Sequence, residues 1–259
     1  MKNPAATKVQ IGPVAHAKIF VNLRRSAQLT MKKASKVAAP VRRLRSGEAP
    51  DIKRKYDPEQ TKRNIIDIAT EEFAAMGLSG ARVDAIAERT NTTKRMLYYY
   101  FGSKEGLYEA VIEEAYGKIR ALEQSLHLDT LEPREGLREL VEFTFDFHDK
   151  HRDFVRLVTI ENIHGAKYVS QLKTFRARNA SVVKTIADLI ARGVAARQFR
   201  SDVDPIDLHL FISSLCFHRV ANRPTFTVAF GRDPSGARSR ARHREMIVDA
   251  VMRFMRRSG

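Results

Sequence analysis

The chain has 259 residues, of which 43% are hydrophobic and 29% are charged, and its formal net charge is +16. This length allows one or two domains with a sizeable apolar core. The single cysteine, Cys216, cannot form an internal disulfide, which excludes a disulfide-stapled secreted fold. No apolar run approaches the roughly 20 residues that span a bilayer. We therefore expect a cytoplasmic protein with no membrane association.

The positive charge is concentrated at the N-terminus. Residues 1–56 contain 14 Lys or Arg and two acidic residues, whereas the remaining 203 residues contain 32 basic and 28 acidic ones. The segment has no helical or strand periodicity and cannot bury enough surface to offset its ordering entropy, so we expect a disordered basic extension. Three interpretations stay open: an arm that binds phosphates, a mis-assigned start with Met31 as the true first residue, or an organelle-targeting peptide.

A first helix is predicted to begin at Asp57, which suits the N-cap position, with Pro58 at the first helical position. Apolar residues then recur at spacings of three and four, which indicates one buried stripe. This stripe consists of Ile65, Ile66, Ala69, Phe73 and Met76. Gly77 should end the helix.

Two shorter helices follow, over residues 82–89 and 94–101. Asn91 lies in the break between them and tolerates the positive φ that a tight turn needs, and Thr93 can cap the second of the two. Two short helices joined by such a turn are typical of a helix-turn-helix unit, whose second helix enters the major groove of DNA.

The helix over residues 94–101 has an unusual composition for a core element. Leu97 and Phe101 should face inward, but three consecutive tyrosines at 98–100 point about 100° apart and cannot all be buried. Exposed phenols suit contacts with thymine methyl groups and phosphate oxygens. Ser103 should cap the next helix, and the cation of Lys104 at a helix start is unfavourable unless a phosphate lies nearby.

The stretch from residue 65 to 112, IIDIATEEFAAMGLSGARVDAIAERTNTTKRMLYYYFGSKEGLYEAVI, resembles the DNA-binding domain of the TetR (tetracycline-repressor) family of bacterial transcriptional regulators. Two departures concern the helix ends: Ala81 stands where the family often has a Thr or Ser cap, and Gly102 where proline is common. The resemblance implies that the first residues of the third helix face base edges, that the tyrosines contact the backbone and thymine methyls, and that Lys104 contacts a phosphate. The implied DNA-binding residues are Arg82, Val83, Thr93, Lys94, Arg95, Met96, Tyr98, Tyr99, Tyr100 and Lys104.

The rest of the chain reads as helical, and no strand pattern competes. Helices are expected over residues 104–126, from 133 onward, and over 153–163, 168–197, 205–222 and 241–256, with a loop over 223–239. The helix over 205–222 is apolar on most of its circumference and should be buried on several sides. We therefore predict an all-α fold with a basic extension (1–56), a three-helix helix-turn-helix DNA-binding domain (57–104) and a helical effector-binding and dimerisation domain (105–259).

The family resemblance also implies an effector pocket and a homodimer formed by the helices over 205–222 and 241–256. Candidate effector-binding residues are Phe143, Phe147, His148, Phe154, Glu161, Asn162, Phe175, Asn179 and Phe217. We expect no cofactor and no metal site, since His148 and His151 form the only close histidine pair.

Catalytic motifs are missing from the sequence: it has no glycine-rich nucleotide loop, no nucleophile elbow and no H-E-x-x-H zinc motif. The sequence thus predicts a cytoplasmic, nucleoid-associated bacterial regulator rather than an enzyme. Its partners would be a palindromic double-stranded DNA operator and a small-molecule effector, with repression the expected activity. The alternatives are a nucleoid-type protein that binds DNA without sequence preference and without an effector, and a nucleic-acid-processing enzyme, which the missing catalytic residues disfavour.

Overall fold

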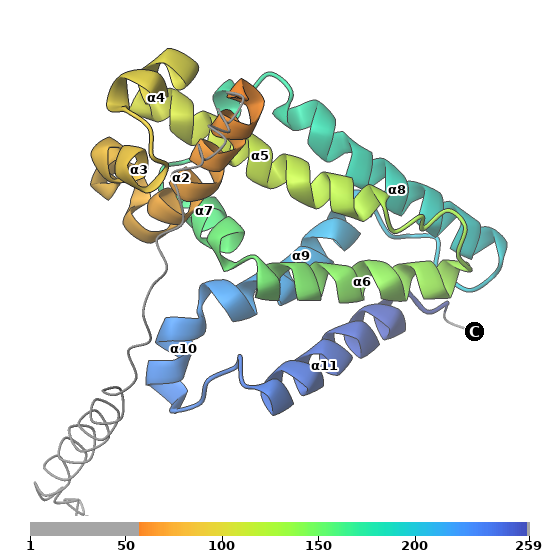
Figure 1. Cartoon of the computed structure of the whole chain (residues 1–259). Coiled ribbons are helices and arrows are strands. Elements are labelled where there is room, and N and C mark those ends of the chain that lie inside the picture. Colours follow the sequence, from red (N-terminus) through yellow and green to blue (C-terminus); the bar gives the residue numbers. More distant parts are fainter. Residues whose placement is uncertain (1–56, 258–259) are drawn as a thin grey trace, which may run out of the picture. The chain divides into compact units, whose positions relative to one another are not determined.

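The computed structural model describes residues 57–257, which form ten α-helices and one short 3-10 helix (Figure 1). In chain order these are α2 (Pro58–Gly80), α3 (Val83–Arg89), α4 (Lys94–Phe101), α5 (Lys104–Gln124), α6 (Pro133–Lys150), α7 (Arg152–Ile163), η1 (Val169–Gln171), α8 (Phe175–Ala195), α9 (Pro205–Ala221), α10 (Arg223–Phe230) and α11 (Ala237–Met255). Within residues 57–257 the only β-structure is an isolated bridge between Phe199 and Arg256. The all-α prediction is confirmed for this part of the chain, and the predicted extension over residues 1–56 lies outside it.

Three helix starts in the N-terminal part agree with the sequence. Asp57, Thr93 and Ser103 each accept a hydrogen bond from a backbone N–H two or three residues further on, at 3.0, 3.3 and 3.0 Å. Each bond satisfies a donor that the helix itself leaves unpaired. The starts of α2, α4 and α5 are therefore fixed by local chemistry.

The first core lies between α2, α3, α4 and the first half of α5, which gather at one end of the described chain (Figure 1). Ile65, Phe73, Ile86, Leu97 and Leu107 are each at most 1% exposed within it. This core holds the short helices α3 and α4 in place, since seven or eight residues are too few for an isolated helix to be stable.

The prediction that Met76 is the last residue of the buried stripe on α2 was wrong. Met76 is exposed over 57% of its surface, whereas Leu78, two residues later, is buried. Gly77 has φ 67° and ψ 173°, a backbone conformation that glycine adopts without strain and that turns the chain out of the helical path. The inward-facing position therefore passes from Met76 to Leu78.

The second core lies between α6, α8, α9 and α11. Phe145, Ile186, Ile212 and Val251 contribute one fully buried side chain from each of these four helices. Cys216 lies in the same core, and burial raises the pKa of its thiol to about 12. The thiol is therefore protonated at neutral pH and shielded from reaction, as the sequence indicated.

The helix predicted over residues 168–197 begins seven residues later, at Phe175. The backbone N–H groups of Tyr168 and Val169 donate to the buried carboxylate of Glu161, at 3.2 and 3.1 Å. This contact from α7 holds the chain in the short helix η1 and a bend before α8 begins. Because it joins residues seven and eight positions apart, helical periodicity could not predict it.

The loop predicted over residues 223–239 is also wrong, because its first half is the helix α10. Pro224 stands in the first turn of α10, where its missing N–H costs nothing, and Gly231 with φ 62° ends the helix. The last helix, α11, begins at residue 237, four residues before the predicted start.

The helix α9 is not buried on several sides within a single chain. Leu208, Ile212 and Cys216 face the core, but Ile206 and Leu210 are more than half exposed, Leu210 over 63% of its surface. The single chain therefore buries one side of α9 and leaves an apolar strip facing outward, so the predicted burial of the helix over 205–222 on several sides would need a partner chain.

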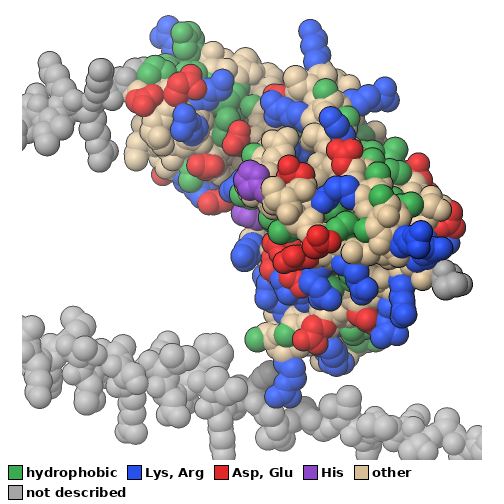
Figure 2. All heavy atoms as spheres, turned by 90° about the vertical axis from the view of Figure 1, so that its right-hand side faces the viewer, with side chains coloured by type: hydrophobic (Ala, Val, Ile, Leu, Met, Phe, Trp, Pro, Cys, Tyr) green, Lys and Arg blue, Asp and Glu red, His purple; other side chains and the backbone are tan. Residues whose placement is uncertain are grey.

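Ion pairs join α11 to α6 along the outside of the second core. Arg240 pairs with Asp146 and Asp149, and Arg244 donates to Glu142 at 3.0 Å. On the face shown in Figure 2, acidic and basic side chains are intermingled rather than separated into regions of one sign. This mixture agrees with the near balance of charge in the sequence after residue 56.

Candidate DNA-binding surface and effector cavity

The turn between α3 and α4 has the conformation of a tight helix-turn-helix corner. Asn91 has φ 52°, as predicted from its tolerance of the left-handed region. Thr90 Oγ1 donates a hydrogen bond to the carbonyl oxygen of Ile86 at 2.8 Å, which closes the end of α3. The corner therefore fixes the direction in which α4 leaves it.

The helix α4 presents one face to the core and another to solvent. Leu97 is buried and Phe101 packs against the same core, as predicted. Tyr99 is 78% exposed and Tyr98 is 40% exposed, whereas Tyr100 packs partly against the core. Two of the three tyrosines thus project outward from the second helix of the unit.

The start of α4 carries its basic residues on the outside. Lys94 Nζ pairs with Asp84 of α3 at 3.2 Å, and the pair is largely exposed. Arg95 is exposed and makes no ion pair within residues 57–257. The backbone N–H of Met96 donates to Thr93, and the side chain of Met96 is half-buried. Arg95 is therefore the cation at this end of α4 that is available to a partner.

The predicted DNA-binding residues outside α4 differ in how far they are exposed. Arg82 is exposed, and its backbone N–H donates to Glu72 at 3.1 Å, which anchors the start of α3 although Ala81 provides no side-chain cap. Val83 is buried, so its side chain supports α3 from inside. Lys104 Nζ donates to the carbonyl oxygen of Ser79 at 3.3 Å and remains partly exposed.

A cavity of about 320 Å³ lies between α5, α6, α7 and α9. Four of the predicted effector-binding residues line it: His148, Phe154, Asn162 and Phe217. The other five do not line it, namely Phe143, Phe147, Glu161, Phe175 and Asn179. Glu161 instead holds the chain before α8, and the ring of Phe175 packs edge-on against Tyr116 at 4.7 Å.

Sequence reasoning missed the charged wall of this cavity. Arg120 and Glu123 form an ion pair on α5, their side chains are only 9% and 10% exposed, and both line the cavity. His209 of α9 lines it as well. One signal in the sequence could have revealed Arg120. Tyr116 and Arg120 are four residues apart, so they share one face of α5, and an aromatic residue at 116 indicates that this face points inward.

Burial shifts the titration of the groups around the cavity. It lowers the pKa of His148 to about 4, assisted by the positive charge of Arg120, and lowers the pKa of His209 to about 4 for the same two reasons. Burial also raises the pKa of Glu123, although the charge of Arg120 opposes this shift. Both histidines are therefore neutral at pH 7, and Arg120 is the cation of the cavity.

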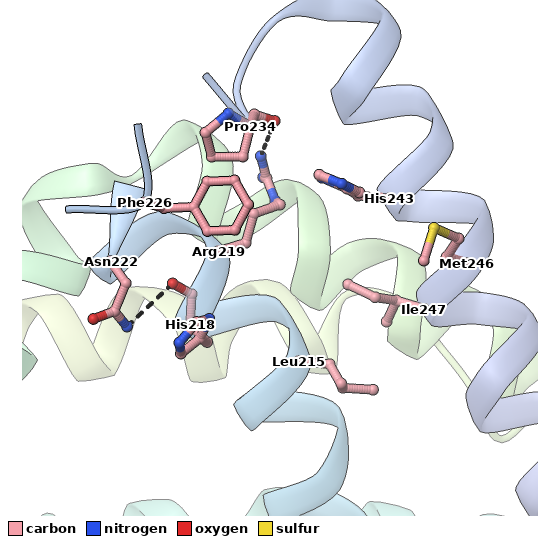
Figure 3. A pocket seen from close by; sticks show the side chains of 9 residues that line it. All are labelled: Leu215, His218, Arg219, Asn222, Phe226, Pro234, His243, Met246 and Ile247. Atoms are coloured by element: carbon pink, nitrogen blue, oxygen red, sulfur yellow. Dashed lines mark hydrogen bonds between the residues drawn. The ribbon is translucent and has the colours of Figure 1, made fainter. Parts of the chain in front are cut away.

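A second, smaller cavity of about 200 Å³ lies between α9, α10 and α11. Figure 3 shows Phe226 of α10 beside Arg219, with His243 and Met246 of α11 on the opposite side. Arg219 donates to the carbonyl oxygen of Pro234 at 3.4 Å. None of the nine predicted effector-binding residues lines this cavity.

Within residues 57–257, no group of three or more His, Cys, Asp or Glu side chains is arranged to hold a metal ion. No helix over these residues is long and apolar enough to cross a membrane.

A capped helix-turn-helix corner with an exposed second helix, joined to a larger helical body that contains a cavity, defines a helix-turn-helix regulator. Two family models match the chain, "Bacterial regulatory proteins, tetR family" over residues 65–111 and "Tetracyclin repressor-like, C-terminal domain" over residues 133–251. The chain is 32% identical over 204 residues to the HTH-type transcriptional repressor NicS of Pseudomonas putida. The matched region covers 79% of this chain and 96% of that protein. It belongs to the TetR family of DNA-binding bacterial transcriptional regulators, which are not enzymes.

Solved structures show the same fold. The putative transcriptional regulator SCO4942 from Streptomyces coelicolor is 26% identical, with a TM-score of 0.57, and the match covers 76% of this chain and 99% of that one. AibR, solved in complex with isovaleryl coenzyme A and operator DNA, is 18% identical with a TM-score of 0.56, covering 73% of this chain and 97% of that one. TetR-family regulators bind operator DNA and effector ligands.

Proposed function

We propose that this chain is a ligand-responsive repressor that binds a palindromic operator as a homodimer and leaves it when a small effector binds. The observation that carries the proposal is that α5 contacts both the core beneath α4 and the cavity. Its first half packs Leu107 and Tyr108 into the core that supports α4, and its second half places Tyr116 and Arg120 in the wall of the cavity. One rigid element therefore connects the two sites.

The DNA contacts are assigned to the outward face of α4 and its flanks. Arg95, which is exposed, would read a base edge in the major groove, and the exposed rings of Tyr98 and Tyr99 would contact thymine methyls and phosphates. Lys104 and Arg82 are assigned to the DNA backbone, while Val83 acts from the core. Tyr100, which packs partly on the core, would orient its neighbours as well as contact DNA.

The homodimer is assigned to α9 and α11. Ile206 and Leu210 of α9, and Met246 and Phe254 of α11, are large apolar residues left exposed in the single chain. Large exposed apolar side chains mark surfaces where proteins associate. Two copies would then present their α4 helices to half-sites about 34–36 Å apart.

Release from DNA requires the effector to bind two states of the dimer with different affinity. The effector would bind α5 together with α6, α7 and α9, and would thereby change the position of α5. Because α5 also packs under α4, the distance between the two α4 helices would change. NicS is a repressor, which supports repression, and AibR was solved in complex with isovaleryl coenzyme A and operator DNA, which supports one protein of this fold binding both an effector and DNA.

Footprinting of the DNA upstream of the protein's own gene tests the proposal. We expect a short, symmetric protected site that is lost on addition of cell extract containing the effector, and a particle in sedimentation of twice the 29.4 kDa chain mass. Coverage without sequence preference would favour the nucleoid-type alternative. A monomer at micromolar concentration would contradict the dimer.

Arg95→Ala separates base reading from general attraction to DNA. Loss of a base contact should weaken operator binding by about 1–3 kcal/mol and leave binding to unrelated DNA nearly unchanged. Arg134→Ala, at an exposed arginine of α6, is the matched control and should change neither. Equal losses on both kinds of DNA would assign Arg95 to a phosphate instead.

A further inference from the structure

The cavity between α5, α6, α7 and α9 contains a buried cation with an unused hydrogen-bond donor. We infer that its effector is a small aromatic carboxylic acid whose carboxylate binds Arg120. This inference rests on the proposed effector function of the cavity and adds the chemical class of the ligand.

Arg120 is built into the wall of the cavity rather than lying at its mouth. The residue is 8% exposed, and its Nη1 donates to Glu123. Its Nε is buried and has no hydrogen-bond partner within residues 57–257, so a ligand in the cavity reaches this donor when the guanidinium turns toward it. A guanidinium is always charged and offers five donors, so an acceptor that reaches Nε would satisfy a donor that folding leaves unpaired. A carboxylate is the acceptor whose geometry fits a guanidinium edge.

The other ionisable groups of the cavity leave this role to Arg120. His148 and His209 are neutral at pH 7, since burial lowers the pKa of each to about 4. Glu123 is the single acidic side chain among the lining residues, and it engages only Nη1 of Arg120. A guanidinium can bind two carboxylates on separate edges, and the Nε edge is the one that remains.

His148 supplies a second polar contact. It is 5% exposed, and its Nδ1 also lacks a hydrogen-bond partner within the described residues. A neutral imidazole nitrogen either donates or accepts, depending on which nitrogen carries the proton. It can therefore pair with a ring substituent or with the second oxygen of the acid.

Aromatic side chains line the part of the cavity that would hold the ring of the ligand. Phe154 lies parallel to the His148 ring, with 6.0 Å between centroids and 9° between planes, and Phe217 meets the same ring edge-on at 5.8 Å. Tyr116 packs edge-on against Phe154 at 5.2 Å. Such walls suit a flat ring. At about 320 Å³, the cavity is at the small end of ligand pockets, which favours a single ring.

Calorimetric titration of the full-length protein with three pairs of probes tests the inference: benzoate and benzamide, salicylate and salicylamide, and phenylacetate and phenylacetamide. Each pair keeps the ring and removes the charge. We expect at least one acid to bind at least tenfold more tightly than its amide. The inference is overturned if no acid binds, or if every amide binds as tightly as its acid.

Two variants assign the preference to this site. Arg120→Gln should remove the tenfold preference, whereas Arg138→Gln should keep it, because Arg138 also faces a glutamate on its own helix but lies on the exposed side of α6. Glu123→Gln should tighten binding of the acid several-fold without tightening the amide, since it removes the competing carboxylate and retains Arg120. An acid preference that survives Arg120→Gln, or an acid affinity unchanged by Glu123→Gln, would overturn the assignment.

Operator binding by the unliganded wild-type protein, measured on the same samples, keeps the two proposals apart. Intact operator binding with no response to the acids would reject the aromatic acid and retain the regulator. Absence of operator binding would reject the regulator itself.

Discussion

The DNA-binding unit and the helical body differ in what they bury. Within the core shared by α2, α3, α4 and the first half of α5, the buried polar groups are two hydroxyls: that of Thr90, which donates to the backbone of α3, and that of Tyr108. The body buries Arg120, His148 and Glu161, and each of these leaves a polar side-chain atom without a partner among the described residues. Burying such groups costs stability, and for Arg120 and His148 the cost falls on residues that line a cavity, which makes them candidates for binding a ligand.

Two of those three groups line the cavity between α5, α6, α7 and α9, and the third contacts the chain that links α7 to α8. Glu161 of α7 holds the chain ahead of α8, and together with burial it raises the pKa of Tyr108 on α5. Tyr108 in turn meets the ring of Phe73 on α2 edge-on at 5.1 Å. A unit that only presents a surface to DNA needs a rigid core. A body that binds a ligand, as we propose for this one, needs polar groups whose hydrogen bonds the ligand can satisfy.

The largest expected effect comes from opening the apolar core of the DNA-binding unit. Leu97→Ala removes a fully buried side chain under α4 and should lower the free energy of unfolding by about 2–5 kcal/mol. Met76→Ala, at the exposed end of α2, should change it by less than about 0.5 kcal/mol. Urea unfolding measures both. Similar losses in the two variants would break the distinction between core and surface drawn for α2 and α4.

The next effect depends on pH and belongs to the body. His148 has its pKa lowered from 6.5 to about 4, so between these values the unfolded chain binds a proton that the folded chain does not. The free energy of unfolding should therefore fall as pH falls through this window, by up to about 1.4 kcal/mol per pH unit. In urea unfolding at pH 7.5 and 5.5, His148→Phe should lose less stability than the wild type. Parallel losses would show that His148 does not titrate as the structure implies.

The third prediction concerns charge outside the DNA-binding unit. Residues 57–104 contain seven basic and seven acidic residues, whereas residues 1–56 carry most of the positive charge. Deleting residues 1–50 should therefore flatten the plot of log K for DNA binding against log salt, by about 0.9 for each phosphate contact removed. Fluorescence anisotropy over a salt series measures the slope. An unchanged slope would mean that the extension makes no phosphate contacts.

The smallest effect comes from the cap of α4. Thr93→Ala removes the acceptor of the Met96 N–H and should cost about 1 kcal/mol. Thr92→Ala is a suitable control, because the Thr92 side chain makes no hydrogen bond within residues 57–257. Thermal unfolding should separate the two variants by a few degrees. If they unfold together, the cap does not stabilise α4.

The sequence predicted features that depend on neighbouring residues. Asp57, Thr93 and Ser103 act as caps because their side chains reach backbone groups two or three residues away, and Asn91 turns the chain through its own φ. The packing of Leu97 followed in the same way from a spacing of four residues. These are local interactions, which a linear reading can resolve.

Features set by distant contacts were missed. The start of α8 depends on Glu161, and α10 forms where two prolines and two glycines over residues 223–239 suggested a loop. The cavity joins residues of four helices, so the partnership of Arg120 with His148 could not be read from one helix. Phe143 and Phe175 were plausible by composition but face other neighbours.

Leu210 has a consequence for how the protein would respond inside a cell. Its side chain forms part of the wall of the cavity between α5, α6, α7 and α9, which we propose binds the effector, yet most of its surface is exposed on the apolar strip of α9. Under the proposed dimer, the same residue would meet both the effector and the second copy, so the two associations would be thermodynamically linked. Dilution would then alter the concentration of effector needed for release, and the number of copies per cell would set the sensitivity of the switch.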